Sequence, residues 1–122
     1  MSKKILIVEN DALMREVMAY ILTSNGYEVF TLSNGSEVFK NIKINHPDLV
    51  IIEAVLPGIN GRDICQLIKL NKTTRDLPVI MCTGDDDRAE YLQQQTGAPD
   101  DVLEKPFDIK SLMQKVEYQL AA

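Results

Sequence analysis

The sequence of 122 residues predicts an α/β fold built around a parallel β-sheet. Three short apolar runs, at residues 5–8, 49–52 and 79–82, are continuous rather than alternating, which is typical of strands covered on both faces. Between these runs lie stretches whose apolar residues recur with helical spacing. Because strand and helix alternate along the chain, we expect parallel strands joined by right-handed crossovers.

Two weaker strands and five helices complete this pattern. Polar residues interrupt the run at 27–32, so we expect an edge strand there, and residues 101–103 form a short fifth strand. Five strand–helix units in a single domain of residues 1–122 predict a flavodoxin-like doubly wound (βα)5 fold, a five-stranded parallel sheet of order 2-1-3-4-5. Asn34 or Ser36 is expected to open the second helix. Helical spacing covers residues 13–22, 38–42, 64–68, 85–95 and 112–120.

Composition excludes several classes of protein. Thirteen Lys and Arg against eighteen Asp and Glu give a net charge of −5, which argues against a nucleic-acid-binding face and against binding to an anionic membrane. No apolar run approaches the roughly 18 residues of a membrane span, and the N-terminus has no signal-peptide pattern, so we expect a cytoplasmic protein. Cys65 and Cys82 lack a paired spacing and are interpreted as reduced core residues.

Polar side chains follow four of the predicted strands. Glu9 and Asn10 come after the first, Glu53 after the third, Thr83 after the fourth and Lys105 after the fifth. In a doubly wound sheet the carboxyl ends of the strands form the functional edge, so these groups should converge there. Oxygen ligands suit Mg2+, and a hydroxyl and an ammonium suit the oxygens of a phosphoryl group, for which a carboxylate can be the acceptor. Taken singly, each residue is better explained as a turn or helix-capping residue, and it is their coincidence at four strand ends that favours a functional site.

Five motifs together resemble the receiver domain of two-component response regulators along nearly the whole chain. They are the first strand with its acidic pair at 5–10, the third strand at 47–53, the loop at 56–61, the fourth strand at 75–84, and Lys105-Pro106-Phe107. The resemblance implies a bacterial phosphorelay signalling protein without enzymatic activity, and a cis peptide bond before Pro106. Because no effector domain follows residue 122, we expect a stand-alone receiver.

The resemblance also assigns roles to individual positions. Position 53 is the phosphoacceptor, Thr83 and Lys105 complete the phosphorylation site, and Thr83 and Val102 occupy the switch positions. A Mg2+ site is implied at Glu9, Asn10, Glu53 and the backbone carbonyl of Val55. Partners are expected to be a histidine kinase, a phosphotransfer protein or a downstream effector. They would bind the face formed by the helix at 85–95, the strand at 101–103 and the helix at 112–120.

Three departures from the family pattern change this expectation. Glu53 stands where the family has aspartate, Asn10 where it has a second acid, and Val102 where it has an aromatic residue. The extra methylene moves the carboxylate about 1.5 Å outward, and an error of about 1 Å can cost about a hundredfold in transfer rate. Asn10 removes a negative charge that would hold Mg2+, so metal binding should be weak. We therefore expect an atypical, degenerate receiver that acts as a protein-interaction module and is not phosphorylated in the usual way.

Two interpretations of Glu53 stay open. Its carboxylate can imitate a phosphoryl group by contacting Lys105, with Thr83 turned inward, or it can form an ion pair that only holds the loops together. The alternative function is a competent single-domain receiver that binds Mg2+ and relays phosphoryl groups from a histidine kinase. A nucleotide-binding domain is disfavoured, because no glycine-rich loop follows the first strand.

Overall fold

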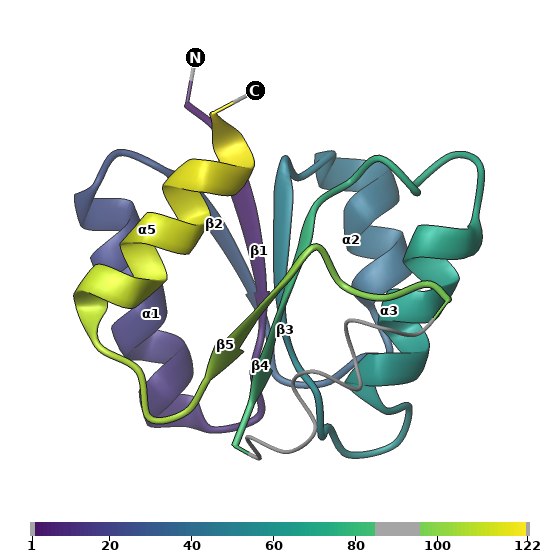
Figure 1. The fold of residues 1–122 in the computed structure, drawn as a ribbon, viewed down its shortest axis with the longest axis horizontal. Helices are drawn as coiled ribbons and strands as arrows, with labels where there is room; N and C mark the ends of the chain where they lie inside the picture. Colours follow the sequence, from purple (N-terminus) through teal and green to yellow (C-terminus); the bar gives the residue numbers. More distant parts are fainter. Residues whose placement is uncertain (1, 85–95, 122) are drawn as a thin grey trace.

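The computed structural model describes residues 2–84 and 96–121, and it contains the predicted parallel sheet (Figure 1). The strands pair in parallel in the order β2-β1-β3-β4-β5, so the predicted order and the edge position of β2 are confirmed. The helix expected at 85–95 lies outside the described residues. The strands are β1 (Lys4–Val8), β2 (Glu28–Leu32), β3 (Leu49–Glu53), β4 (Val79–Thr83) and β5 (Asp101–Glu104).

Helices cover both faces of this sheet. Figure 1 shows α1 (Ala12–Ser24) and α5 (Ile109–Leu120) on one face, with α2 (Val38–Asn45) and α3 (Gly61–Leu70) on the other. Alternate residues of each central strand therefore enter different cores. Leu6 of β1 packs on the side of α2 and α3, whereas Ile7 packs on the side of α1 and α5. Both faces must be apolar, which explains why these strands are continuous hydrophobic runs. No described helix is both long and apolar enough to cross a membrane.

Polar side chains fix where three of the helices begin. Asp11 accepts a hydrogen bond from the backbone of Met14 at the start of α1, and Asp108 does the same for Ser111 at the start of α5. Asn60 caps α3.

The expected start of the second helix was wrong. α2 begins at Val38, and Glu37 stands at its N-cap without a side-chain hydrogen bond. The Asn34 side chain instead accepts hydrogen bonds from the Ser36 backbone at 2.9 Å and from the Ser36 hydroxyl at 2.7 Å. This local turn occupies both candidate caps before the helix starts.

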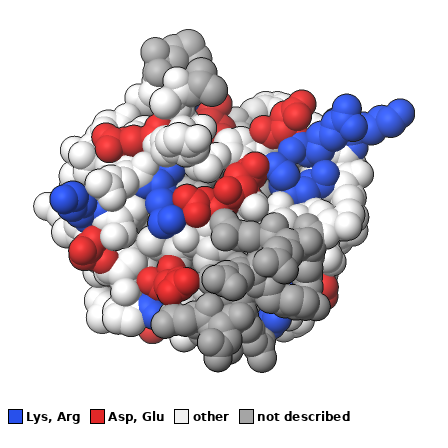
Figure 2. Space-filling model, viewed as in Figure 1, with Lys and Arg blue, Asp and Glu red and all other residues white. Residues whose placement is uncertain are grey.

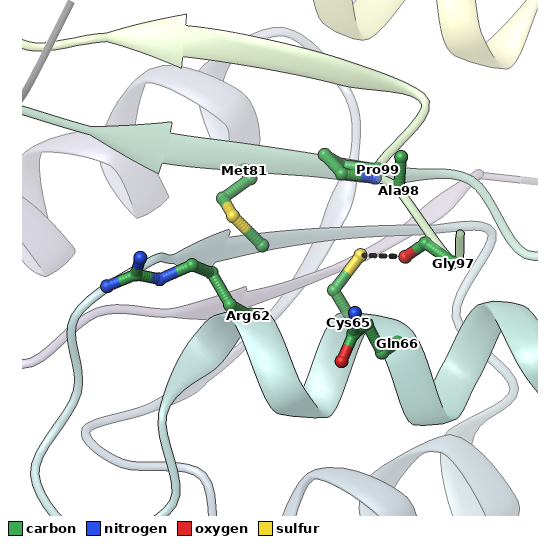
Figure 3. Close-up of a pocket in the computed structure, with 7 residues that line it drawn as sticks. All are labelled: Arg62, Cys65, Gln66, Met81, Gly97, Ala98 and Pro99. Atoms are coloured by element: carbon green, nitrogen blue, oxygen red, sulfur yellow. Dashed lines mark hydrogen bonds between the residues drawn. The ribbon is translucent and has the colours of Figure 1, made fainter. Parts of the chain in front are cut away.

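A small pocket beneath α3 contains one of the two cysteines. Figure 3 shows residues of α3, β4 and the segment before β5 around it, with Cys65 donating to the carbonyl of Gly97 at 3.7 Å. Its volume of about 10 Å³ holds one water at most, so this pocket is not a ligand site. Cys65 and Cys82 are both free and buried, and burial raises the pKa of each thiol to about 12. The predicted core position of both cysteines is confirmed, and their reduced state stays a prediction.

Two local features bear on the carboxyl edge of the sheet. The peptide bond between Lys105 and Pro106 is cis, as the family resemblance implied. At the other side of this edge, the backbone N–H of Gly61 donates to the carbonyl of Ala54 at 3.0 Å. A Cβ atom added to Gly61 would overlap the carbonyl oxygen of Glu53. The first turn of α3 therefore rests directly on the backbone that carries the Glu53 side chain, and only glycine allows this approach.

Replacing Gly61 by alanine should destabilise the protein by about 1–3 kcal/mol, because the new methyl group forces the end of β3 and the start of α3 apart. Urea unfolding of the variant and the wild type measures this difference. Gly84→Ala is the matched control, since a Cβ atom there would meet no atom within 4 Å. We expect the control to change stability by about 0.5 kcal/mol or less. Equal effects of the two substitutions would contradict the close packing at Gly61.

Candidate functional site

The carboxyl edge of the sheet brings an ammonium group between two carboxylates. Glu9 directly follows β1 and Glu53 ends β3; these two strands are neighbours, with Val8 opposite Ile52. Lys105 directly follows β5, and its side chain reaches both acids. The predicted convergence of these three residues is confirmed, and we refer to Glu9, Glu53 and Lys105 together as the acid site.

Lys105 forms two ion pairs of nearly equal length. Its Nζ atom lies 2.8 Å from Oε1 of Glu9 and 2.9 Å from Oε1 of Glu53. The Glu9 side chain is only 2% exposed, compared with 22% for Glu53 and 21% for Lys105. A carboxylate this deeply buried is costly unless a charge and hydrogen bonds compensate it. Lys105 therefore supplies the positive charge that the buried Glu9 requires.

Backbone N–H groups donate hydrogen bonds to the other two carboxylate oxygens. Oε2 of Glu9 accepts from the N–H of Asp11 at 3.1 Å, and Oε2 of Glu53 accepts a longer bond from the N–H of Asn10 at 3.4 Å. Each of the four carboxylate oxygens in the acid site thus accepts a hydrogen bond from the chain itself. The predicted contact of Glu53 with Lys105 is confirmed, while the equally short contact with Glu9 was not predicted.

Arg15 is a further residue of this region, and the sequence analysis did not predict it. Its Nη1 atom donates to the carbonyl oxygen of Glu9 at 2.8 Å and, more weakly, to that of Asn10 at 3.4 Å. The guanidinium thus holds the loop between β1 and α1 through its carbonyl groups, whereas the amides of this loop donate to Glu9 and Glu53. A cation near the start of a helix opposes the helix dipole, and this unfavourable position was the signal in the sequence that could have identified it.

The pKa values of the two acids in the site are shifted in opposite directions. Burial, followed by the hydrogen-bonded carboxyl of Glu53, raises the pKa of Glu9. Burial would also raise the pKa of Glu53, but the neighbouring Glu9 carboxyl and the hydrogen-bonded Lys105 ammonium outweigh burial and hold that pKa below its ordinary value. Burial would lower the pKa of Lys105, but hydrogen bonds to both glutamates raise it.

The other predicted site residues lie along the same edge. Thr83 ends β4, is 5% exposed, and its carbonyl accepts from the backbone N–H of Lys105 at 2.6 Å. The inward orientation of its hydroxyl stays a prediction. Val102 lies within β5 opposite Met81 and is 7% exposed, and its switch role stays a prediction. Val55 follows β3 with an exposed side chain, and its carbonyl as a metal ligand also remains untested.

The predicted Mg2+ ligands do not form a ready cation site. In residues 2–84 and 96–121, no group of three or more His, Cys, Asp or Glu side chains is arranged to hold a metal ion. Both carboxylates of the predicted set, Glu9 and Glu53, already share the Lys105 ammonium. A divalent ion between the same oxygens would have to displace that ammonium. The residues as placed therefore do not fit Mg2+, and its weak binding stays a prediction.

Replacing Glu53 by glutamine should make stability less sensitive to acid. Because the pKa of Glu53 is lowered in the folded protein, its carboxylate contributes stability above its ordinary pKa of 4.5, and this contribution is lost as the pH falls through the lower folded value. Urea unfolding at a series of pH values should show the wild type losing more stability than Glu53→Gln below pH 4.5. Parallel losses in the two proteins would show that Glu53 is not stabilised as a carboxylate.

Comparison with known proteins agrees with this geometry. The family model for the response regulator receiver domain matches residues 5–117. A structure described as that of a response regulator from Chloroflexus aurantiacus J-10-fl superposes with a TM-score of 0.92 at 31% identity, covering 100% of both chains. The chemotaxis response regulator CheY4 of Vibrio cholerae has a TM-score of 0.89 over 98% of this chain and 100% of its own; at 21% identity this likeness shows the fold alone.

Curated relatives are longer proteins that contain such a domain. The phosphate regulon transcriptional regulatory protein PhoB of Klebsiella pneumoniae is 33% identical over 120 residues, which cover 96% of this chain and 51% of PhoB. The chain thus spans about half the length of the curated relatives it matches. The match to the family model, which covers most of the sequence, settles the assignment. The chain belongs to the family of receiver domains of two-component response regulators.

Proposed function

We propose that this domain is an atypical receiver that acts as a protein-interaction module without being phosphorylated on residue 53. The observation that carries the proposal is the pair of contacts from the Lys105 ammonium to Glu53 at 2.9 Å and to Glu9 at 2.8 Å. The lysine that the family resemblance assigns to the phosphorylated site is already engaged by carboxylates in the unmodified chain. The domain is further proposed to act in the bacterial cytoplasm.

Glu53 serves in this proposal as a permanent substitute for a phosphorylated residue. Its longer side chain brings negative charge to Lys105, where a phosphoryl oxygen would otherwise be held. The substitute is partial, because a carboxylate carries about one charge on two oxygens, whereas a phosphoryl group carries about −1.5 to −2 on three. The contact therefore favours an active-like arrangement of the edge without reproducing the full charge of phosphorylation.

The same contacts argue against Glu53 as an efficient phosphoryl acceptor. An acceptor oxygen must be free to attack in line, and transfer depends on this alignment. Oε1 of Glu53 is bonded to Lys105, and Oε2 receives the backbone N–H of Asn10. Phosphorylation would require at least one of these hydrogen bonds to break and the carboxylate to shift.

The partner surface is proposed to include β5 and α5. A groove of about 380 Å³ lies between them, and its lining includes Val102, Phe107 and Lys115. Elsewhere on α5, Ile109 and Tyr118 are 59% and 79% exposed. Large exposed apolar side chains are typical of interaction surfaces. The third part of the predicted face, residues 85–95, lies outside the described residues.

A protein partner fits this surface better than a nucleic acid does. Figure 2 shows acidic and basic side chains side by side where β5 and α5 lie, whereas the larger group of basic side chains in this view lies at its upper right, away from α5. The net charge of the sequence is −5. Relatives such as MtrA are named DNA-binding response regulators, but this chain matches only about half of their length. We therefore propose a histidine kinase, a phosphotransfer protein or a downstream effector as the partner.

The competing function is a competent receiver that takes up a phosphoryl group, favoured by the presence of Thr83 and Lys105 at matching positions. Incubation with a small phosphodonor and Mg2+, followed by intact-mass measurement, separates the two functions. We expect the wild type to gain no phosphoryl group. The double variant Asn10→Asp with Glu53→Asp restores the family's residues and is the positive control. Its shorter side chain at residue 53 and its additional acid at residue 10 should allow phosphoryl transfer. Stoichiometric phosphorylation of the wild type on Glu53 would refute the proposed function.

A further inference from the structure

We propose that the Lys105 ammonium is the built-in cation of the acid site and that it keeps divalent metal ions out of this site. The four carboxylate oxygens of Glu9 and Glu53 already have donors from the chain, and two of these oxygens converge on the same Nζ atom. Bridging two carboxylates is the task that a metal ion performs in an acidic pocket. In this chain a side chain performs it.

The geometry around Nζ is suited to an ammonium and not to Mg2+. The two N–O distances of 2.8 and 2.9 Å are those of charge-assisted hydrogen bonds. Mg2+ requires oxygen ligands at about 2.0–2.1 Å in a near-octahedral arrangement. Glu9 and Glu53 would have to close in by nearly an ångström after the ammonium had left, because an ammonium and a divalent ion at the same two oxygens repel each other.

Departure of Lys105 is itself unfavourable. Its side chain starts from a fixed point, since its backbone N–H donates to the carbonyl of Thr83 at 2.6 Å. If the ammonium swung out to solvent, Glu9, at 2% side-chain exposure, would be left as an unpaired buried charge. Binding of a metal ion must therefore first offset the free energy lost when both ion pairs of Lys105 break.

Arg15 adds a second positive charge beside the site. Its guanidinium is bonded to the carbonyl oxygens of Glu9 and Asn10, so it faces the loop from which two of the expected ligands come. Asn10 contributes no negative charge to offset it. Lys105 and Arg15 together place two positive charges in the region, and these charges repel a divalent cation.

This inference deepens the proposed function and rests on it for its biological meaning: a site with its own cation holds its arrangement regardless of the Mg2+ concentration. The two remain separable by experiment. Phosphorylation is detected by mass, whereas metal exclusion is detected by binding of Mg2+ alone in the absence of any phosphodonor. A wild type that binds Mg2+ but takes up no phosphoryl group would contradict only the inference made here.

Calorimetric titration of the full chain with Mg2+ tests the inference. We expect no saturable heat with the wild type, and a saturable single site with Lys105→Met whose association constant is at least about tenfold higher. Mg2+ should also raise the melting temperature of the variant and leave that of the wild type unchanged. Lys105→Gln is the second variant, because its amide still donates to the buried Glu9 and protects the fold if the methionine variant is unstable.

Two further variants locate the cause of the change. Lys115→Met removes a lysine that pairs with Asp101 at 3.0 Å instead of with the acid site, so it should gain no Mg2+ binding. Asn10→Asp adds an acid while keeping Lys105 and should bind far more weakly than Lys105→Gln. The inference is overturned if the wild type binds Mg2+ as tightly as the lysine variants, or if a folded lysine variant binds none. It is also overturned if Asn10→Asp alone matches Lys105→Gln, since the missing acid would then be the limiting factor.

Discussion

The contact of one ammonium with two glutamates organises the functional edge of this receiver domain. Lys105 connects the end of β5 to the ends of β1 and β3, and it passes β4 to do so. Because Glu9 is buried, this contact stabilises the fold as well as arranging the site. The ends of three strands are thereby held in one arrangement by charges that the chain supplies.

The fold provides the positions from which this contact is made. Parallel pairing places the carboxyl ends of β1 and β3 side by side, and the packing of Gly61 on Glu53 fixes the backbone below the second carboxylate. Arg15 holds the loop between β1 and α1, which carries Glu9, by donating to the Glu9 carbonyl oxygen. The Glu53 side chain is long enough to reach Lys105, at 2.9 Å, so it joins the network of ion pairs that Glu9 and Lys105 form.

Sequence reasoning predicted the sheet and the edge well because both follow from local patterns. Continuous apolar runs identified the strands, and the residues directly after them identified the edge at which Glu9, Glu53 and Lys105 meet. The sharing of Lys105 between the two acids could not be predicted, because it depends on how far a side chain reaches across β4. The cap of α2 was missed for a related reason: the hydrogen bond between Asn34 and Ser36 competes locally with helix capping.

Nitrogen-15 and proton NMR of the Lys105 side-chain ammonium tests the central claim, that this group is held between both carboxylates in the unmodified protein. The account predicts a resolved NH3+ signal that exchanges slowly with water, moves in both Glu9→Gln and Glu53→Gln, and does not respond to Mg2+. Surface lysines, whose ammonium protons exchange rapidly, provide the internal comparison. A Lys105 signal that is lost to rapid exchange, or one that shifts on addition of Mg2+, would contradict the account.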